Sequence, residues 1–121
     1  AKPIVRIMSV TMTKTRDKGL RTFIHSQHDQ YFSRFHSPQS VLESFKTSVS
    51  HHVGEFARDI PVKTLLIAGS LDDITPLSKQ YALVKRFPSA KLKVITNVGH
   101  LTHYETPELV ARHVQEFIKS V

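Results

Sequence analysis

The sequence predicts an α/β fold, in which a parallel strand–helix–strand–helix unit over residues 61–121 follows a helical segment over residues 1–60. Two observations lead to this class. Residues 61–121 alternate short apolar stretches with longer amphipathic ones, and two strands joined by a helix are expected to run parallel. Residues 1–60 instead space many of their apolar side chains at the helical period. At 121 residues the chain is one domain at most.

Two strands are predicted in the second segment. Residues 64–68 form a short apolar run that follows Pro61 and ends at Gly69, which is typical of a parallel strand covered on both faces. Residues 91–96 alternate polar and apolar side chains, which indicates a strand with one wetter face.

Each predicted strand is followed by a helix that begins with a capping threonine and a proline. The first begins at Thr75-Pro76 and ends at Pro88, and the second begins at Thr106-Pro107. The second helix carries one apolar stripe, made of Leu109, Val110, His113, Val114, Phe117 and Ile118.

The first segment is predicted to contain helices. One spans residues 20–35, where a helical period is kept by Leu20, Phe23, Ile24, Tyr31, Phe32 and Phe35. Its aromatic residues are predicted to be core, or the apolar wall of a cap over a substrate pocket. Another helix begins at Ser37-Pro38, and residues 51–59 form a third. Residues 4–12 fit either a strand or a helix.

Composition narrows the class of protein. The formal net charge is +7, but residues 1–60 hold nine Lys and Arg and residues 61–121 hold eight, so no stripe or tail concentrates charge for nucleic acid. We therefore expect no nucleic-acid binding. We also expect no membrane binding, because no stretch resembles a membrane span or a secretory signal. The absence of cysteine makes a cytoplasmic setting the expectation. The first residue is Ala1 rather than Met, which indicates a trimmed, processed or partial chain.

The strongest candidate site consists of Asp72 and His100, which lie 28 positions apart in the loops that follow the two predicted strands. The carboxyl ends of parallel strands meet at one edge of a sheet, where ligands bind in α/β folds. A carboxylate beside a histidine holds its tautomer and stabilises its protonated form, so that the histidine can act as a general base.

Each residue of this pair also has a simpler interpretation. Asp72 alone fits an Asx-turn after a strand, and His100 after a glycine fits a tight turn. Asp73 is the competing acid, but the three-residue step from Gly69 to Asp72 favours Asp72. His103 and Tyr104 are predicted to be rim or packing residues.

Residues 61–121 resemble the C-terminal end of the α/β-hydrolase family. The resemblance rests on a Pro-led apolar strand, G-x-x-D with a proline four residues on, a helix, a strand, G-H, and a final helix near T-P-E. It implies that Asp72 is the acid and His100 the base of a catalytic triad that hydrolyses an ester or similar acyl bond of a small molecule. It implies no organic cofactor and no metal. Residues 1–60 look like a helical cap with a connecting segment.

The sequence departs from that family at the nucleophile. The family's serine lies in G-x-S-x-G, and none of the four glycines here (Gly19, Gly54, Gly69, Gly99) flanks a serine in that way. We therefore expect this chain alone to be inactive. The rival prediction is a non-catalytic, self-associating unit derived from the same fold. In either case the strand at residues 63–68 lacks a neighbour on one side, which predicts a homodimer.

Five other histidines are candidate metal ligands. His25 and His28 are three apart on a predicted helix, His36 follows, and His51 and His52 are adjacent. Because no cysteine or suitably placed acidic residue joins them, surface or cap roles are favoured over zinc and no metal site is predicted.

Overall fold

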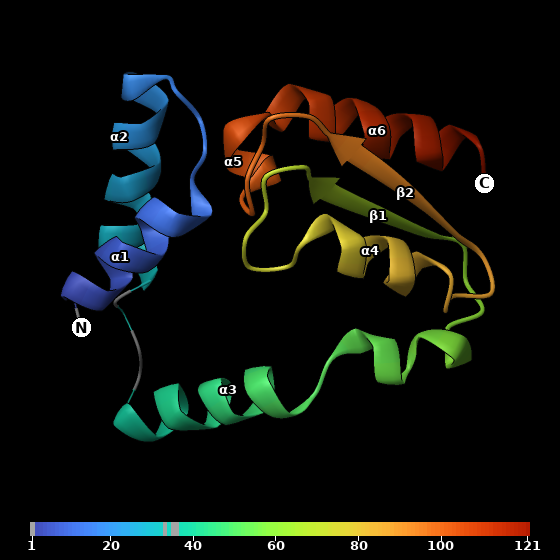
Figure 1. The fold of residues 1–121 in the computed structure, drawn as a ribbon, viewed down its shortest axis with the longest axis horizontal. Coiled ribbons are helices and arrows are strands. Elements are labelled where there is room, and N and C mark those ends of the chain that lie inside the picture. The colour runs from blue at the N-terminus through green and yellow to red at the C-terminus, as the bar shows by residue number, and fades with distance from the viewer. Residues whose placement is uncertain (1, 33, 35–36) are drawn as a thin grey trace.

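The computed structural model describes residues 2–32, 34 and 37–121, and it has an α/β arrangement (Figure 1). A two-stranded parallel sheet pairs β1 (Thr64–Gly69) with β2 (Ala90–Ile95), in a register that sets Thr64 opposite Ala90. The predicted strands and their parallel direction are confirmed.

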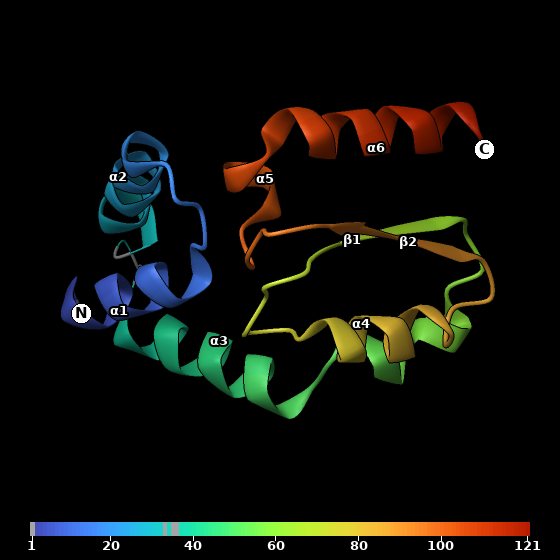
Figure 2. The same cartoon turned by 45° about the horizontal axis from the view of Figure 1, so that its top comes forward.

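Helices cover both faces of this sheet. In Figure 2, α4 (Leu77–Val84) lies below the strands and α6 (Pro107–Lys119) lies above them. Helix α4 contacts both strands, whereas α6 contacts β1. The prediction that β1 is covered on both faces is therefore confirmed, and its side chains are half-buried or buried along its whole length.

The loop after β2 contains an unpredicted short helix, α5 (Thr102–Glu105). It lies at the carboxyl end of the strands, between the sheet and the N-terminal helices (Figure 1). Helix α4 is shorter than the predicted helix between Thr75-Pro76 and Pro88: it begins at Leu77 and ends at Val84.

The first segment is helical. The structure resolves the ambiguity at residues 4–12 in favour of a helix, α1 (Lys2–Met12). Helix α2 (Lys18–Gln27) is capped by Asp17 and continues into a wider π turn, η1 (His28–Phe32). Helix α3 (Pro38–Ser50) begins after Ser37, as predicted.

The prediction of a helix over residues 51–59 is wrong. Two 3-10 turns, η2 (Val53–Glu55) and η3 (Ala57–Asp59), occupy this stretch. The carbonyl of Gly54, which a continuous helix would use internally, instead accepts a hydrogen bond of 3.1 Å from Arg86. Glu55 turns back to accept from the backbone N–H of His52 at 3.2 Å. The Glu55 contact closes a single turn, and the Arg86 contact occupies the Gly54 carbonyl, so a continuous helix does not propagate.

One apolar cluster joins the N-terminal helices to the loop after β2. It is built from Met12 of α1, Ile24 of α2 and Leu101, and Leu20 and Tyr104 pack against it. This cluster docks the first segment at the carboxyl end of the sheet.

The aromatic residues predicted to be core are mostly exposed, which corrects that prediction. Phe23, Tyr31 and Phe32 each leave about half of their surface accessible, and Phe35 lies outside the described residues. The side of α2 and η1 that faces α1 and α5 instead buries Ile24, His25 and His28. Within the described residues, no helix combines the length and hydropathy that a membrane span needs.

Candidate functional site

Asp72 and His100 lie in contact beyond the carboxyl ends of the two strands. Nδ1 of His100 is 2.9 Å from Oδ2 of Asp72. The side chain of Asp72 is 5% exposed and that of His100 is 32% exposed. The predicted juxtaposition of the two side chains is confirmed, and the histidine is the member of the pair that solvent reaches.

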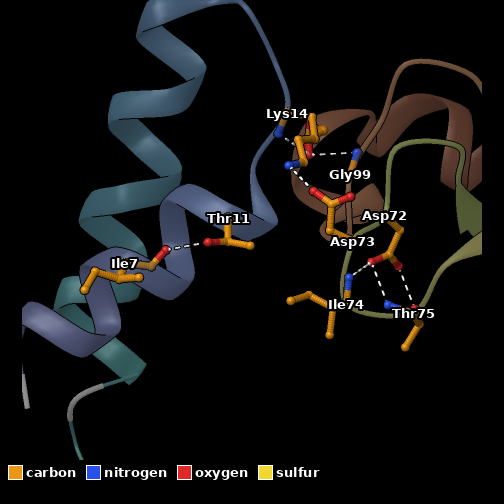
Figure 3. A network of polar contacts seen from close by, with 9 residues as sticks. Ile7, Thr11, Lys14, Asp72, Asp73, Ile74, Thr75 and Gly99 are labelled. Carbon is orange, nitrogen blue, oxygen red and sulfur yellow. Dashed lines mark hydrogen bonds and ion pairs between the residues drawn. The ribbon is translucent and has the colours of Figure 1, made fainter.

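Asp72 is also held by the loop that carries it. Its Oδ1 accepts hydrogen bonds from the backbone N–H groups of Ile74 (2.8 Å) and Thr75 (2.9 Å). Its Oδ2 accepts from the hydroxyl of Thr75 at 2.6 Å (Figure 3). The Asx-turn interpretation and the contact with His100 are therefore both correct, because the carboxylate serves both at once.

These contacts set the charge of the carboxylate. Burial acts to raise the pKa of Asp72, but hydrogen bonds from the Thr75 hydroxyl and backbone, from His100 and from Ile74 outweigh it. The pKa of Asp72 is therefore held below its ordinary value, and the group is ionised at neutral pH. An ionised carboxylate only accepts hydrogen bonds, so Nδ1 of His100 carries a proton in this contact, and in the neutral form of the ring the free lone pair is on Nε2.

Two glycines let the loops approach each other closely. A Cβ atom on Gly69 would lie 2.2 Å from the carbonyl oxygen of Gly99 and 2.3 Å from that of Val98. The backbone N–H of Leu71 donates to the same Val98 carbonyl at 2.9 Å. No side chain fits between the loops, which explains the glycine ahead of each candidate residue.

The segment after α1 forms another wall of the site. The backbone N–H of His100 donates to the carbonyl of Met12 at 3.1 Å. Nζ of Lys14 lies 2.5 Å from Oδ2 of Asp73, which projects toward Lys14 in Figure 3. The side chain of Asp73 is 64% exposed and pairs with Lys14. Asp72 rather than Asp73 is therefore the carboxylate that meets His100.

Glu105 is a buried carboxylate that the sequence interpretation did not single out. It is 8% exposed at the end of α5. Its Oε1 accepts hydrogen bonds from the backbone N–H groups of Lys14 (3.1 Å) and Gly99 (3.2 Å). Its position five residues after His100 could have marked it as a candidate. Its contact with Lys14, 91 positions away, could not be inferred from the sequence.

Two aromatic residues within α5, His103 and Tyr104, follow the candidate histidine. The ring of Tyr104 contacts those of Phe23, His28 and His103, with centroid separations between 4.8 and 6.4 Å. The packing role predicted for Tyr104 agrees with this, and His103 is exposed as a rim residue would be.

A serine–histidine contact lies between α1 and α2, away from the Asp72–His100 pair. The hydroxyl of Ser9 is 2.6 Å from Nδ1 of His25, and both residues are buried. Because Ser9 is 0% exposed, no substrate reaches it, and the contact fastens one helix to the other. No group of three or more His, Asp or Glu within the described ranges could hold a metal ion.

A cavity of about 480 Å³ opens beside the two loops. Its lining includes Lys14 and Arg16 from the first segment, Leu71 and Asn97 from the strand-end loops, and Glu105. Asn97 turns the chain after β2 with a φ of 60°, a conformation that asparagine tolerates better than most residues.

Comparison with known proteins identifies hydrolases. The chain is 39% identical over 61 residues to a 2-hydroxymuconate semialdehyde hydrolase of Pseudomonas putida, a match covering 50% of this chain and 22% of that protein. It is 26% identical over 117 residues to an uncharacterized hydrolase of Bacillus subtilis, covering 93% of this chain and 42% of that protein. No family model matches the sequence.

Solved structures show similarity over most of the chain as well. An esterase from Exiguobacterium antarcticum superposes with a TM-score of 0.78 at 15% identity, covering 98% of this chain and 42% of the esterase. At that identity the match concerns the fold. The chain spans less than half the length of these curated and structural relatives.

Proposed function

Because this chain belongs to the α/β-hydrolase fold family, of which it carries the C-terminal portion, we propose that Asp72 and His100 are the acid and the base of a hydrolase triad. The single observation that carries the proposal is the 2.9 Å contact between Oδ2 of Asp72 and Nδ1 of His100 at the ends of neighbouring parallel strands.

The geometry suits general-base chemistry. The ionised Asp72 accepts a hydrogen bond from the Nδ1–H group of His100, which leaves Nε2 to take a proton from a nucleophile. When Nε2 becomes protonated, the carboxylate beside the ring stabilises the positive charge. The part of the ring that remains exposed gives a nucleophile access to it.

The nucleophile and the oxyanion donors are proposed to come from residues outside these 121, since no G-x-S-x-G occurs here. The proposed substrate is an ester or similar acyl compound of small size. The nature of the relatives supports this class, because they include an esterase and a semialdehyde hydrolase.

Residues 1–60 are proposed to be a cap-like and connecting segment, and residues 61–121 the core segment. The apolar cluster of Met12, Ile24 and Leu101 supports this division, because it places the first segment over the carboxyl end of the sheet. That end is where substrates bind in open α/β folds.

Replacement of Asp72 tests the proposal. In a polypeptide that also supplies the nucleophile, we expect Asp72→Asn to lower kcat for a p-nitrophenyl ester by roughly 10⁴-fold, because the imidazole loses the partner that orients it. Asp73→Asn is the matched control and should retain near-wild-type kcat, since Asp73 faces Lys14. Equal activity of Asp72→Asn and the wild type would contradict the proposal.

The 121-residue chain provides a complementary assay. Alone, it should hydrolyse p-nitrophenyl esters no faster than free histidine does. Saturable turnover that disappears in His100→Ala would show that the chain is itself a complete catalyst.

A second candidate function is self-association without catalysis, and one observation favours it. Strand β1 pairs with β2 along one edge, and within the described residues its other edge has no partner strand. A homodimer would pair this edge with its copy in a second chain.

A further inference from the structure

Glu105 connects two segments that are 91 positions apart in the chain. Its Oε1 lies between the backbone N–H of Lys14, at 3.1 Å, and that of Gly99, at 3.2 Å. Its Oε2 is also buried, and among the described residues it has no hydrogen-bond partner. Burial of a carboxylate is costly unless donors compensate, so the two N–H groups on Oε1 account for its presence.

The peptide between Gly99 and His100 also contacts the first segment directly. The carbonyl of Met12 accepts the N–H of His100 at 3.1 Å. A Cβ atom on Gly99 would lie 2.5 Å from that carbonyl oxygen, 2.8 Å from Cγ of Lys14 and 3.0 Å from Oε1 of Glu105. The Gly99–His100 peptide therefore sits between residues 12–14 and α5 with no spare room.

Apolar packing continues the same junction on the other side of His100. Leu101 is 6% exposed and joins Met12 and Ile24 in the core cluster. Lys14 also reaches the first strand-end loop through Asp73 (Figure 3). Residues 12–14 thus contact both loops that present the candidate pair.

We propose that Glu105 is a positioning residue, whose Oε1 fixes the Gly99–His100 peptide against residues 12–14 and thereby holds the His100 ring on Asp72. Glu105 acts through the backbone and touches neither substrate nor reacting atoms. The inference rests on the proposed role of His100. It adds that the first segment supports the active base.

Charge-assisted hydrogen bonds explain why one oxygen is enough. A carboxylate oxygen that accepts two N–H groups binds each more strongly than a neutral acceptor does, and low local dielectric strengthens both contacts. Loss of that oxygen leaves the buried N–H group of Gly99 and the partly buried one of Lys14 unpaired, which costs more than the hydrogen bonds contribute. We then expect the Gly99–His100 peptide to shift toward solvent, where water can pair with these N–H groups, and the His100 ring to shift with it.

Amide hydrogen exchange and imidazole NMR signals of the 121-residue chain test the inference without an activity assay. In Glu105→Ala we expect exchange at the Lys14 and Gly99 amides to accelerate on the order of tenfold or more. The Nδ1 proton signal of His100 should weaken or shift as its contact with Asp72 loosens. Glu108→Ala, an exposed change in the first turn of α6, is the matched control and should alter neither.

Rescue by the conservative variant separates positioning from general stability. Glu105→Gln keeps an oxygen in the place of Oε1 and puts the amide NH₂ in the place of the unpartnered Oε2. Because the amide oxygen is a neutral acceptor, exchange at both amides should fall between that of wild type and that of Glu105→Ala, and the His100 signal should persist. A merely structural role would instead accelerate exchange throughout α5 and α6 while the His100 signal stayed in place.

Two results would overturn the inference. One is a folded Glu105→Ala chain in which the Lys14 and Gly99 amides and the His100 signal match wild type. If that variant does not fold, the wild-type chain decides: NMR coupling across the hydrogen bonds should connect Cδ of Glu105 to both amide nitrogens, and its absence would refute the contact. Failure of the proposed catalytic role would be seen separately, as activity retained by His100→Ala in a polypeptide that also supplies the nucleophile.

Discussion

Single residues at the strand ends carry the geometry of the site, and the glycines set how closely the loops approach. Gly69 and Gly99 face backbone atoms that cannot move aside, because those atoms belong to the neighbouring loop and to the segment after α1. Gly19 is different: a Cβ there would meet only the end of the Asp17 side chain, at 3.3 Å.

These environments predict different effects of the same substitution. Gly69→Ala and Gly99→Ala should each destabilise the chain by about 1–3 kcal/mol, the typical cost of forcing a methyl group into a filled space. Gly19→Ala, near the start of α2, should be neutral or stabilising by up to about 1 kcal/mol, because alanine favours helix. Urea unfolding midpoints would rank the three variants, and equal midpoints would disprove the close approach.

Two buried histidines predict the pH dependence of stability. Burial lowers the pKa of His25 below its ordinary value of 6.5, and Arg6, His28 and Arg21 add to the effect while Asp29 opposes it. Burial likewise lowers the pKa of His28, assisted by His103 and opposed by Asp29. The unfolded chain therefore binds more protons than the folded chain once pH falls below about 6.5.

Stability from these histidines is thus fully present above pH 6.5 and is lost as pH falls through their lowered folded pKa values. His28→Leu should reduce this loss, because it removes a buried group whose Nε2 has no partner among the described residues. His52→Leu, at a side chain that is 67% exposed, is the control. Chemical unfolding at pH 5 and pH 8 measures how much stability each variant loses between the two pH values. If His28→Leu loses as much as the wild type, the role given to His28 is contradicted.

At the scale of helices and strands, one sequence signature has three outcomes. A hydroxyl residue followed by proline occurs at Ser37, Thr75 and Thr106, and each predicts a capped helix start. Only Ser37 caps, by accepting from the N–H of Ser40 at 3.1 Å. The Thr75 hydroxyl donates to Asp72 and that of Thr106 donates to the carbonyl of Thr102.

The cap at Ser37 predicts a local effect. Ser37→Ala should lower the stability of α3 by about 1 kcal/mol, since the first turn loses the acceptor for one of its free N–H groups. Thr106→Ala should leave the start of α6 unchanged, because its hydroxyl does not cap that helix. Residue-specific amide exchange at the start of each helix would report both, and equal fraying at the two helices would contradict this prediction.

At the scale of the whole molecule, the two strands differ in the charge that they carry against pairing with another chain. Strand β2 exposes Lys91 and Lys93, and such charges typically protect an edge strand from pairing. Strand β1 carries no charge between Thr64 and Gly69, although its outer edge has no partner strand within the described part of the chain. The expected homodimer remains a prediction, and this contrast supports β1 as its site.

Sedimentation equilibrium over a range of micromolar concentrations tests the homodimer. We expect association above the 13.8 kDa monomer, together with an unfolding midpoint that rises with protein concentration. Exchange of the first segment between chains is the alternative route to a dimer. A monomer with concentration-independent unfolding would show that the outer edge of β1 does not pair in solution. The cytoplasmic setting and the lack of nucleic-acid binding also remain predictions.

The sequence by itself determined the features that depend on local patterns and short crossovers. A continuous apolar run predicted β1, and side-chain periodicity predicted β2 and α6. One strand–helix–strand connection must bring Asp72 and His100 to the same edge of a parallel sheet. The start of α3 followed from Ser37-Pro38, because a cap requires only neighbouring residues.

Only the tertiary structure decided what joins the two segments. Glu105 meets Lys14 across 91 positions, and Met12 meets His100, through contacts that no local pattern encodes. The same reason explains the errors: Arg86 takes the Gly54 carbonyl that a helix over residues 51–59 needed, and packing against α1 turned Ile24 rather than Phe23 inward. Periodicity sets which side chains share a face of a helix, but the partner that covers one face decides which of them become core.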